Sequence, residues 1–329
     1  SQQPKHNYIL YGALAVLVLA DMIPVNKRFF GDEHFVRAKE ADSYFTIQSY
    51  EQEILKDTDP NFRVLNLATN TFNDARTSYR LKSIGGYSAA KLRRYQDLID
   101  MHISQEMNPL MQTIMQTQGF MLPDANEGRN FAVLNMLNMK YAVVSLQDGR
   151  QAPIQNPYAM GNCWFVDDIM LVDTPDEECD KIDDINLHTQ AVADKCFADA
   201  LDITKPEVTT MMAFDEETIE LTSYAPNCLE YTAHNERNKV AVFSEIYYPQ
   251  DWHLYIVDEQ GNNSVEIPIA RVNYTLRAAV IPAGEHKLRM EFKPHALQTD
   301  KLSMAILILA LILSAIGLTY PLWKKNKVL

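Results

Sequence analysis

Residues 73–96 read NDARTSYRLKSIGGYSAAKLRRYQ and set a glycine pair among cations. The stretch holds six Lys or Arg residues and one acidic residue, whereas the whole chain has a net charge of −13. Gly85 and Gly86 can adopt backbone angles that other residues avoid, and Ser88 is a good N-cap for a following helix. A glycine turn leading into a helix N-terminus directs several N–H groups at one point. Such a point favours a bound anion.

The chemistry expected of this stretch is binding of a phosphate or a lipid headgroup, with charge-assisted hydrogen bonds from nearby cations. The candidate binding residues are Lys82, Gly85, Gly86, Ser88, Lys91, Arg93 and Arg94. The spacing of a P-loop or a dinucleotide-binding fingerprint is absent from the sequence. The alternative is a tight turn followed by a solvated basic helix face that meets anionic lipid.

Aromatic residues gather in a second stretch, FSEIYYPQDW, which ends at Trp252. Tyr247, Tyr248 and Trp252 are candidates for stacking on sugar rings, or for a position at a lipid headgroup boundary. The alternative is that these side chains are core and corner residues of a β-sandwich. Both interpretations place them at the end of a strand.

Two acidic stretches invite a metal or acid–base interpretation. Gly31-Asp32-Glu33-His34 follows the first apolar segment, where carboxylates can serve a lipid-linked sugar donor, but it equally suits a hydrated loop. The run Asp176–Asp184 lacks the calcium-loop pattern and favours a solvated helix with an acidic first turn. The eight histidines are scattered, and neither H-E-x-x-H nor G-x-S-x-G occurs. We therefore expect no metal, no cofactor and no catalytic constellation.

Charge and composition limit the possible partners. Residues 166–220 hold 17 acidic residues against three lysines, and this acidity argues against nucleic acid as a partner. The 329 residues are enough for two ordinary domains. A hydrophobic content of 47% is typical of globular proteins. The four cysteines (Cys163, Cys179, Cys196 and Cys228) form no C-x-x-C pair. Disulfide pairing and buried free thiols are both open for them.

Two apolar segments lie near the ends of the chain. Tyr8–Val25 has one charge, and Leu302–Trp323 has none. Crossing a bilayer takes about 20 apolar residues, so both are expected to be transmembrane helices, with a secretory signal as the alternative for the first. Three lysines after the second segment favour a cytoplasmic C-terminus, although the charges around the first point weakly the other way. We expect the segment between them to be extracytoplasmic, and residue 1, a serine, to lie within a longer protein.

Helix and strand patterns interleave between residues 26 and 204 and predict an α/β region. The expected strands are Phe62–Ala68, Tyr141–Leu146 and Cys163–Val172. A helical pattern starts after Ser88, is expected to restart at Asn108-Pro109 and stops at Gly119. Its apolar stripe consists of Leu92, Tyr95, Ile99, Ile103 and Met107. Further helices are expected at Arg129–Met139 and Asp176–Ile185.

The pattern changes to β-strands from about Lys205. Leu288, Met290 and Phe292 alternate with charged residues, as in a half-buried strand. Residues 205–298 are therefore predicted to be an antiparallel β-sandwich. The expected strands are Thr218–Tyr224, Cys228–His234, Lys239–Tyr248, Trp252–Asp258, Tyr274–Ile281 and His286–Lys293. The fold class is α+β, with the α/β region and the sandwich flanked by two transmembrane helices.

Several stretches together resemble the C-terminal portion of the YfhO family of bacterial membrane proteins. They are NDARTSY, KSIGGY, KLRRYQ, NP…GN, WFV, FSEIYYP and VIPAGEH, and the resemblance extends over nearly the whole chain. The family consists of large polytopic proteins similar to type C glycosyltransferases. These enzymes take sugars from polyprenyl-phosphate carriers outside the cytoplasm.

The resemblance implies a location in the bacterial cytoplasmic membrane and a part in transferring a sugar from a polyprenyl-phosphate carrier to a cell-surface polymer. The catalytic carboxylate of such enzymes lies on an early loop of the N-terminal helical region. The resemblance therefore implies that Asp32 and Glu33 only look like it, and that this chain alone is inactive. The alternative function is a non-enzymatic module that binds a glycan or a partner protein and supports envelope assembly or export.

Overall fold

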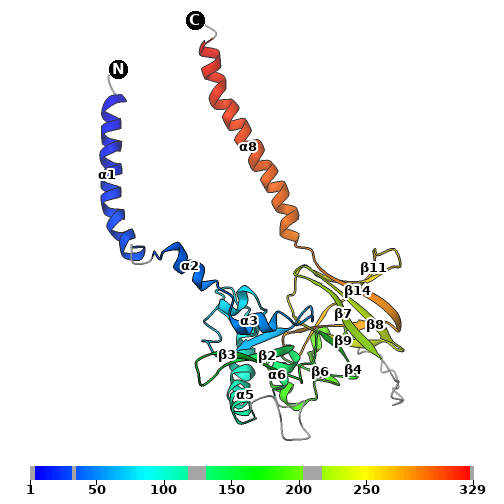
Figure 1. Ribbon diagram of the computed structural model, residues 1–329. Coiled ribbons are helices and arrows are strands. Elements are labelled where there is room, and N and C mark those ends of the chain that lie inside the picture. Colours follow the sequence, from blue (N-terminus) through cyan, green and yellow to red (C-terminus); the bar gives the residue numbers. More distant parts are fainter. Residues whose placement is uncertain (1–3, 32–34, 118–130, 203–216, 327–329) are drawn as a thin grey trace. The chain divides into compact units, whose positions relative to one another are not determined.

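The computed structural model describes residues 4–31, 35–117, 131–202 and 217–326. The chain divides into two compact units, Ser1–Gln52 and Glu53–Leu329. The first unit contains helices α1 (Pro4–Phe29) and α2 (Ala38–Tyr44), and α3 (Ser49–Ile54) spans the boundary (Figure 1). Within the described residues, one helix, Tyr8–Phe29, is long and apolar enough to cross a membrane. It contains the first predicted transmembrane segment.

The C-terminal helix α8 (His295–Asn326) contains the second predicted transmembrane segment. Its apolar stretch among the described side chains is Lys301–Ser314, which is shorter than a membrane span. The side chains that would complete the predicted segment lie outside those described. The second transmembrane helix therefore stays a prediction.

The α/β part of the second unit is built on a three-stranded sheet. β1 (Arg63–Asn66) pairs in parallel with β2 (Met139–Ser145), which pairs in antiparallel fashion with β3 (Gln151–Gln155). Helices α4 (Arg93–Leu98), α5 (Ser104–Thr117) and α6 (Ala132–Met136) belong to this part, and a π-helical turn, Ile99–Ile103, joins the first two. Apolar side chains of β1, β2 and these helices form one core cluster. The predicted apolar stripe places Ile99 and Ile103 in it.

The expected helix restart at Asn108-Pro109 is wrong, because Pro109 lies inside α5. A proline in a helix removes the hydrogen bond to the carbonyl four residues earlier. Here that carbonyl belongs to Gln105, an exposed residue in the first turn. Water can solvate the carbonyl there, so the helix tolerates the proline.

A second parallel pair follows along the chain. β5 (Asp168–Val172) and β6 (Gln190–Asp194) are joined by α7 (Pro175–Asp180) and a 3-10 turn, Lys181–Asp184. Thr174 caps α7 by accepting the N–H of Glu177 at 3.2 Å. The predicted strand Cys163–Val172 is divided at Asp167 into β4 (Cys163–Val166) and β5, which enter different sheets.

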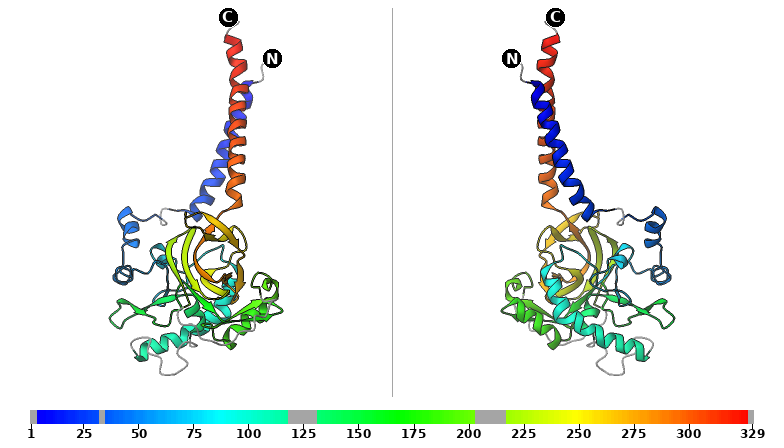
Figure 2. Two further views of the ribbon diagram at one scale, coloured as in Figure 1. Left: turned by 90° about the vertical axis from the view of Figure 1, so that its right-hand side faces the viewer. Right: turned by 90° about the vertical axis from the view of Figure 1, so that its left-hand side faces the viewer.

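Two antiparallel sheets make up the remainder, seen from two sides in Figure 2. The five-stranded sheet has the order β11-β10-β14-β8-β7, and the four-stranded sheet has the order β12-β13-β9-β4. Their strands are β7 (Thr218–Ala225), β8 (Cys228–Asn235), β9 (Lys239–Ile246), β10 (Trp252–Val257), β11 (Asn263–Ile267), β12 (Ala270–Val272), β13 (Leu276–Ile281) and β14 (Gly284–Phe292). All six predicted strands are present, and β11 and β12 are additional. Side chains of both sheets, such as Leu229 and Phe243, share one hydrophobic cluster.

Glu106 of α5 is hydrogen-bonded to α6, and we expect it to make the stability of the fold depend on pH. Its carboxylate oxygens accept the N–H groups of Val133 and Leu134, each at 2.9 Å. Burial, opposed by these two bonds, raises the pKa of Glu106 from 4.5 to about 7. The folded chain therefore holds a proton that the unfolded chain has lost between these two pH values.

Stability is expected to fall as the pH rises from 4.5 to 7, because the folded chain must then lose the proton on Glu106. One pKa unit is worth about 1.4 kcal/mol. Because Glu106 is only half-buried, the expected loss of unfolding free energy is about 2 kcal/mol, less than the full shift would give. Urea unfolding of the full chain in detergent micelles at several pH values measures this loss. The Glu106→Gln variant should lack this component of the pH dependence. An unchanged pH profile in that variant would assign the dependence to other groups.

Candidate functional site

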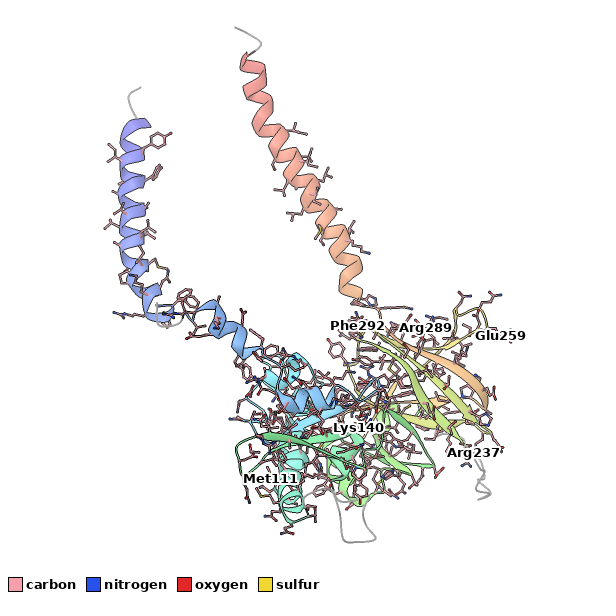
Figure 3. All side chains as sticks on the ribbon, viewed as in Figure 1. Met111, Lys140, Arg237, Glu259, Arg289 and Phe292 are labelled. Carbon is pink, nitrogen blue, oxygen red and sulfur yellow. The ribbon has the colours of Figure 1, made fainter. Side chains whose placement is uncertain are left out.

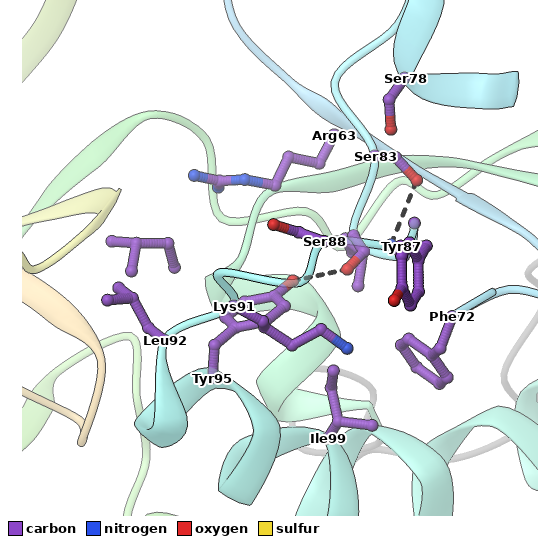
Figure 4. A pocket seen from close by; sticks show the side chains of 14 residues that line it. Arg63, Phe72, Ser78, Ser83, Tyr87, Ser88, Lys91, Leu92, Tyr95 and Ile99 are labelled. Carbon is purple, nitrogen blue, oxygen red and sulfur yellow. Dashed lines mark hydrogen bonds between the residues drawn. The ribbon is translucent and has the colours of Figure 1, made fainter. Parts of the chain in front are cut away.

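A pocket of about 400 Å³ lies beside the glycine pair predicted from the sequence (Figure 4). Four of the seven predicted binding residues line it, namely Gly85, Gly86, Ser88 and Lys91. The other lining residues are Arg63, Phe72, Ser78, Ser83, Ile84, Tyr87, Leu92, Tyr95, Ile99 and Ile246. The pocket therefore combines an apolar wall with hydroxyl groups and two cations.

The glycine pair is required by a close approach of two backbone segments. A Cβ atom at Gly85 would lie 2.0 Å from the carbonyl oxygen of Thr71, so no larger residue fits. Gly86 has a φ of 105° and donates its N–H to the same oxygen at 2.7 Å. The turn thus packs directly against the backbone of Thr71. Because Gly85 and Gly86 line the pocket, this contact also shapes the pocket wall.

Ser88 does not cap the following helix, and that prediction is wrong. Helix α4 begins five residues later, with Leu92 at the N-cap position and no side-chain cap. The Ser88 hydroxyl instead accepts the N–H of Ala90 at 3.3 Å, forming a local turn. The glycine turn therefore does not lead directly into a helix N-terminus.

Aromatic and aliphatic side chains form most of the pocket wall. The Tyr95 hydroxyl donates to the carbonyl of Ile84 at 2.7 Å, which fixes its ring against the turn (Figure 4). Burial raises the pKa of Tyr95 to about 12, so this hydroxyl stays protonated. Phe72 and Tyr87 complete an aromatic border that Figure 4 shows near Lys91. An apolar chain fits such a wall better than a free sugar does.

The two lining cations differ in how firmly they are held. Arg63 donates to the carbonyl of Leu137 at 2.7 Å and to the hydroxyl of Ser244 at 3.0 Å, so its guanidinium is held in place by structural hydrogen bonds. Lys91 donates to the amide oxygen of Gln96 at 3.0 Å, and its amine lies 5.8 Å from the ring centroid of Phe72. A neutral amide is readily exchanged for an anion. Lys91 is therefore the cation that a ligand in the pocket would engage.

The other three predicted cations do not line the pocket. Lys82 bonds to Asn61, and its amine lies 2.9 Å from the ring centroid of Tyr224. Burial lowers the pKa of Lys82 to about 8. Arg93 is 88% exposed and pairs with Asp97 at 2.8 Å.

Arg94 also has a structural neighbour, since its guanidinium lies 4.9 Å from the ring centroid of Tyr274. The structure therefore separates the four predicted binding cations into one that lines the pocket, Lys91, and three that are directed elsewhere. Helical periodicity could not reveal this separation, because the chain between Gly86 and Arg93 is not helical.

Two of the predicted glycan-binding aromatics, Tyr247 and Trp252, are half-buried. Trp252 lies 3.9 Å from the Arg277 guanidinium and 5.3 Å from the ring of Phe292, which is labelled in Figure 3. Tyr247 makes an edge contact with Phe197 at 5.7 Å. Tyr248 is 41% exposed. Trp252 and Tyr247 thus each pack against other side chains, and stacking of the three aromatics on a sugar stays a prediction.

The acidic run Asp176–Asp184 is not a wholly solvated helix. Glu178 is fully buried and pairs with Arg271 at 2.5 Å, while its other oxygen accepts the N–H of Tyr274 at 3.0 Å. In the described part of the chain, no three His, Cys, Asp or Glu side chains converge as metal ligands. All four cysteines are free thiols. Asp32, Glu33 and His34 lie outside the described residues.

Phe72, Tyr87 and Tyr95 line the pocket but were not predicted as binding residues from the sequence. Tyr87 directly follows the glycine pair, and Tyr95 lies on the apolar stripe, so both were near recognised features. Phe72 comes from the loop that holds Thr71, and only the folded chain brings it to the pocket.

Comparisons with family models, with curated proteins and with solved structures find no match to this chain.

Proposed function

We propose that this chain is the extracytoplasmic part of a YfhO-like polytopic protein of the bacterial cytoplasmic membrane, which transfers a sugar from a polyprenyl-phosphate carrier to a cell-surface polymer. Within that activity, the pocket beside Gly85 and Gly86 holds the phosphate and the first isoprene units of the carrier. The proposal includes a second membrane span in α8 and a β-sandwich formed by the two larger sheets.

This proposal rests on the pocket, because its apolar wall lies beside Lys91, a cation whose hydrogen bond to Gln96 a ligand can replace. An isoprenoid phosphate has the matching parts: a hydrocarbon chain and a dianionic head. Charge-assisted bonds from Lys91 and from the hydroxyl of Ser88 suit the head, and Phe72, Leu92 and Ile99 suit the chain. The apolar helix Tyr8–Phe29 supports a location where such carriers occur.

Lys91→Ala is expected to weaken binding of farnesyl phosphate, a short carrier analogue, by about tenfold to a hundredfold, since a hydrogen bond to a charged group is worth about 1.5–3 kcal/mol. Calorimetric titration of the full chain in detergent micelles measures this loss. Arg93→Ala, which removes the same charge from the same stretch but outside the pocket, should change the affinity less than twofold.

Farnesol serves as the ligand control, because it partitions into micelles without presenting a phosphate. Its binding should be weaker than that of farnesyl phosphate and unaffected by Lys91→Ala. Equal losses for Lys91→Ala and Arg93→Ala would indicate general attraction of anionic lipid and would refute the pocket assignment.

A further inference from the structure

Large apolar side chains are exposed where helix α1 ends. Phe29, Phe30, Phe35 and Val36 are 77%, 68%, 65% and 63% exposed, and they follow one another closely along the chain. A contiguous exposed apolar patch of this kind marks an interaction surface. We propose that these four side chains, the juxtamembrane patch, insert into the headgroup region of a phospholipid bilayer.

The length of α1 accounts for the level at which the patch lies. Its apolar stretch Tyr8–Phe29 has 22 residues. At 1.5 Å per residue this stretch is about 33 Å long, and the hydrocarbon core of a bilayer is about 30 Å thick. A helix that crosses the core therefore reaches its boundary at Phe29, and Phe30 follows directly. This step rests on the membrane location in the proposed function and not on the carrier pocket.

Two rings of the patch are held against each other. The centroids of Phe30 and Phe35 lie 5.2 Å apart and the rings are perpendicular, which is a favourable edge-to-face arrangement. Because the rings are already in contact, they lose less side-chain freedom on insertion than two separate rings would. Peripheral membrane anchors bury phenylalanine rings in this way, at the boundary between headgroups and acyl chains.

Polar residues limit the patch on both sides. Lys27 and Arg28 lie in the last turn of α1, where long cationic side chains extend to lipid phosphates while their stems stay along apolar surface. On the other side, the carboxylate of Glu40 accepts the backbone N–H of Arg37 at 3.3 Å, at the start of the polar helix α2. The apolar stretch between these limits is short, which suits the headgroup region and not the hydrocarbon core.

Site-directed spin labelling of the full chain in vesicles of phosphatidylethanolamine and phosphatidylglycerol tests the insertion. Cys196→Ser and Cys228→Ser first remove the two less buried thiols. A nitroxide on Val36→Cys should then collide more often with oxygen, which concentrates among acyl chains, than with a water-soluble nickel chelate. Phe30→Ser combined with Phe35→Ser should raise its collision rate with the chelate by about threefold or more, because the segment withdraws from a depth of about 5–10 Å.

Two controls accompany this comparison. Tyr79→Ser removes an aromatic ring that is 53% exposed outside the patch, and it should not change the collision rates of the Val36 label. A second nitroxide, on Leu14→Cys within α1, reports whether that helix crosses the bilayer. The Leu14 label should stay in the hydrocarbon core in the parent chain and in the double serine variant.

The inference is overturned if the Val36 label meets the nickel chelate equally in the parent chain and in the double serine variant, or if Tyr79→Ser shifts it as much. Dipolar broadening between Val36 labels would assign the patch to a second copy of the chain and would overturn it as well. A Val36 label in water with a Leu14 label in the hydrocarbon core refutes the inserted patch alone. If both labels lie in water, the membrane location fails too, and with it the proposed function.

Discussion

Arg271→Met is expected to cost the second unit about 3–5 kcal/mol of unfolding free energy, which is typical for removing one partner of a buried ion pair. Arg271 donates to Glu178 at 2.5 Å, and Asp194 lies 4.0 Å from the same guanidinium group. The variant leaves the fully buried Glu178 carboxylate without its counter-ion. Burial already raises the pKa of Glu178, so the carboxyl would take up a proton at a higher pH still.

Urea unfolding of the full chain in micelles, followed by tryptophan emission, measures this loss at pH 7.5. The loss should shrink as the pH falls, because protonation of Glu178 removes the unpaired charge. The control is Glu178→Gln combined with Arg271→Met. It keeps an acceptor for the Tyr274 N–H and no charge, and it should be more stable than Arg271→Met alone. A single variant within 1 kcal/mol of the parent would show that the pair contributes little.

Gly85→Ala is expected to destabilise the turn by about 3 kcal/mol or more and to abolish ligand binding in the pocket, because overpacking against a fixed backbone ranks among the costliest single changes. The added Cβ would meet the Thr71 carbonyl oxygen at 2.0 Å. Relief requires separating two segments that a hydrogen bond from Gly86 joins at 2.7 Å. The same urea unfolding and farnesyl phosphate titration measure both effects.

Gly149→Ala is the matched control for this prediction. Gly149 has a φ of 80° in a loop, and a Cβ there would meet no atom within 4 Å. An alanine at Gly149 meets no clash and has only the left-handed strain, which costs roughly 1–2 kcal/mol and is not present at Gly85. If Gly85→Ala and Gly149→Ala lost equal stability, the close approach at Thr71 would not explain the glycine.

The strands were the most predictable part of the fold. Alternation of buried and exposed residues located β14 and its neighbours, because each has one face in a core and one in water. β12 was not predicted, since it has three buried residues in succession, and β5 was predicted only as a continuation of β4, without the division at Asp167. A change of partner sheet leaves no periodic signal in the sequence.

The glycine turn of the candidate site was predictable from the sequence, but the contacts of the cations around it were not. The glycine pair among cations predicted a turn with backbone angles that favour glycine. The structure contains this turn, and the close approach of the Thr71 carbonyl oxygen to Gly85 explains why glycine is needed there. The roles of the cations depended on partners distant in the chain, such as Tyr224 for Lys82 and Tyr274 for Arg94. Glu178 was interpreted as solvated for the same reason, because Arg271 lies 93 residues away in sequence.

Photo-crosslinking with a diazirine-bearing polyprenyl phosphate tests the central claim most directly. The full chain in nanodiscs is irradiated with the probe and the labelled residues are mapped by mass spectrometry. Labels are expected on Phe72, Tyr87, Leu92 and Ile99, and they should be reduced by Lys91→Ala and by competing farnesyl phosphate but not by farnesol. Labels confined to α1 and α8, or unchanged in Lys91→Ala, would contradict it.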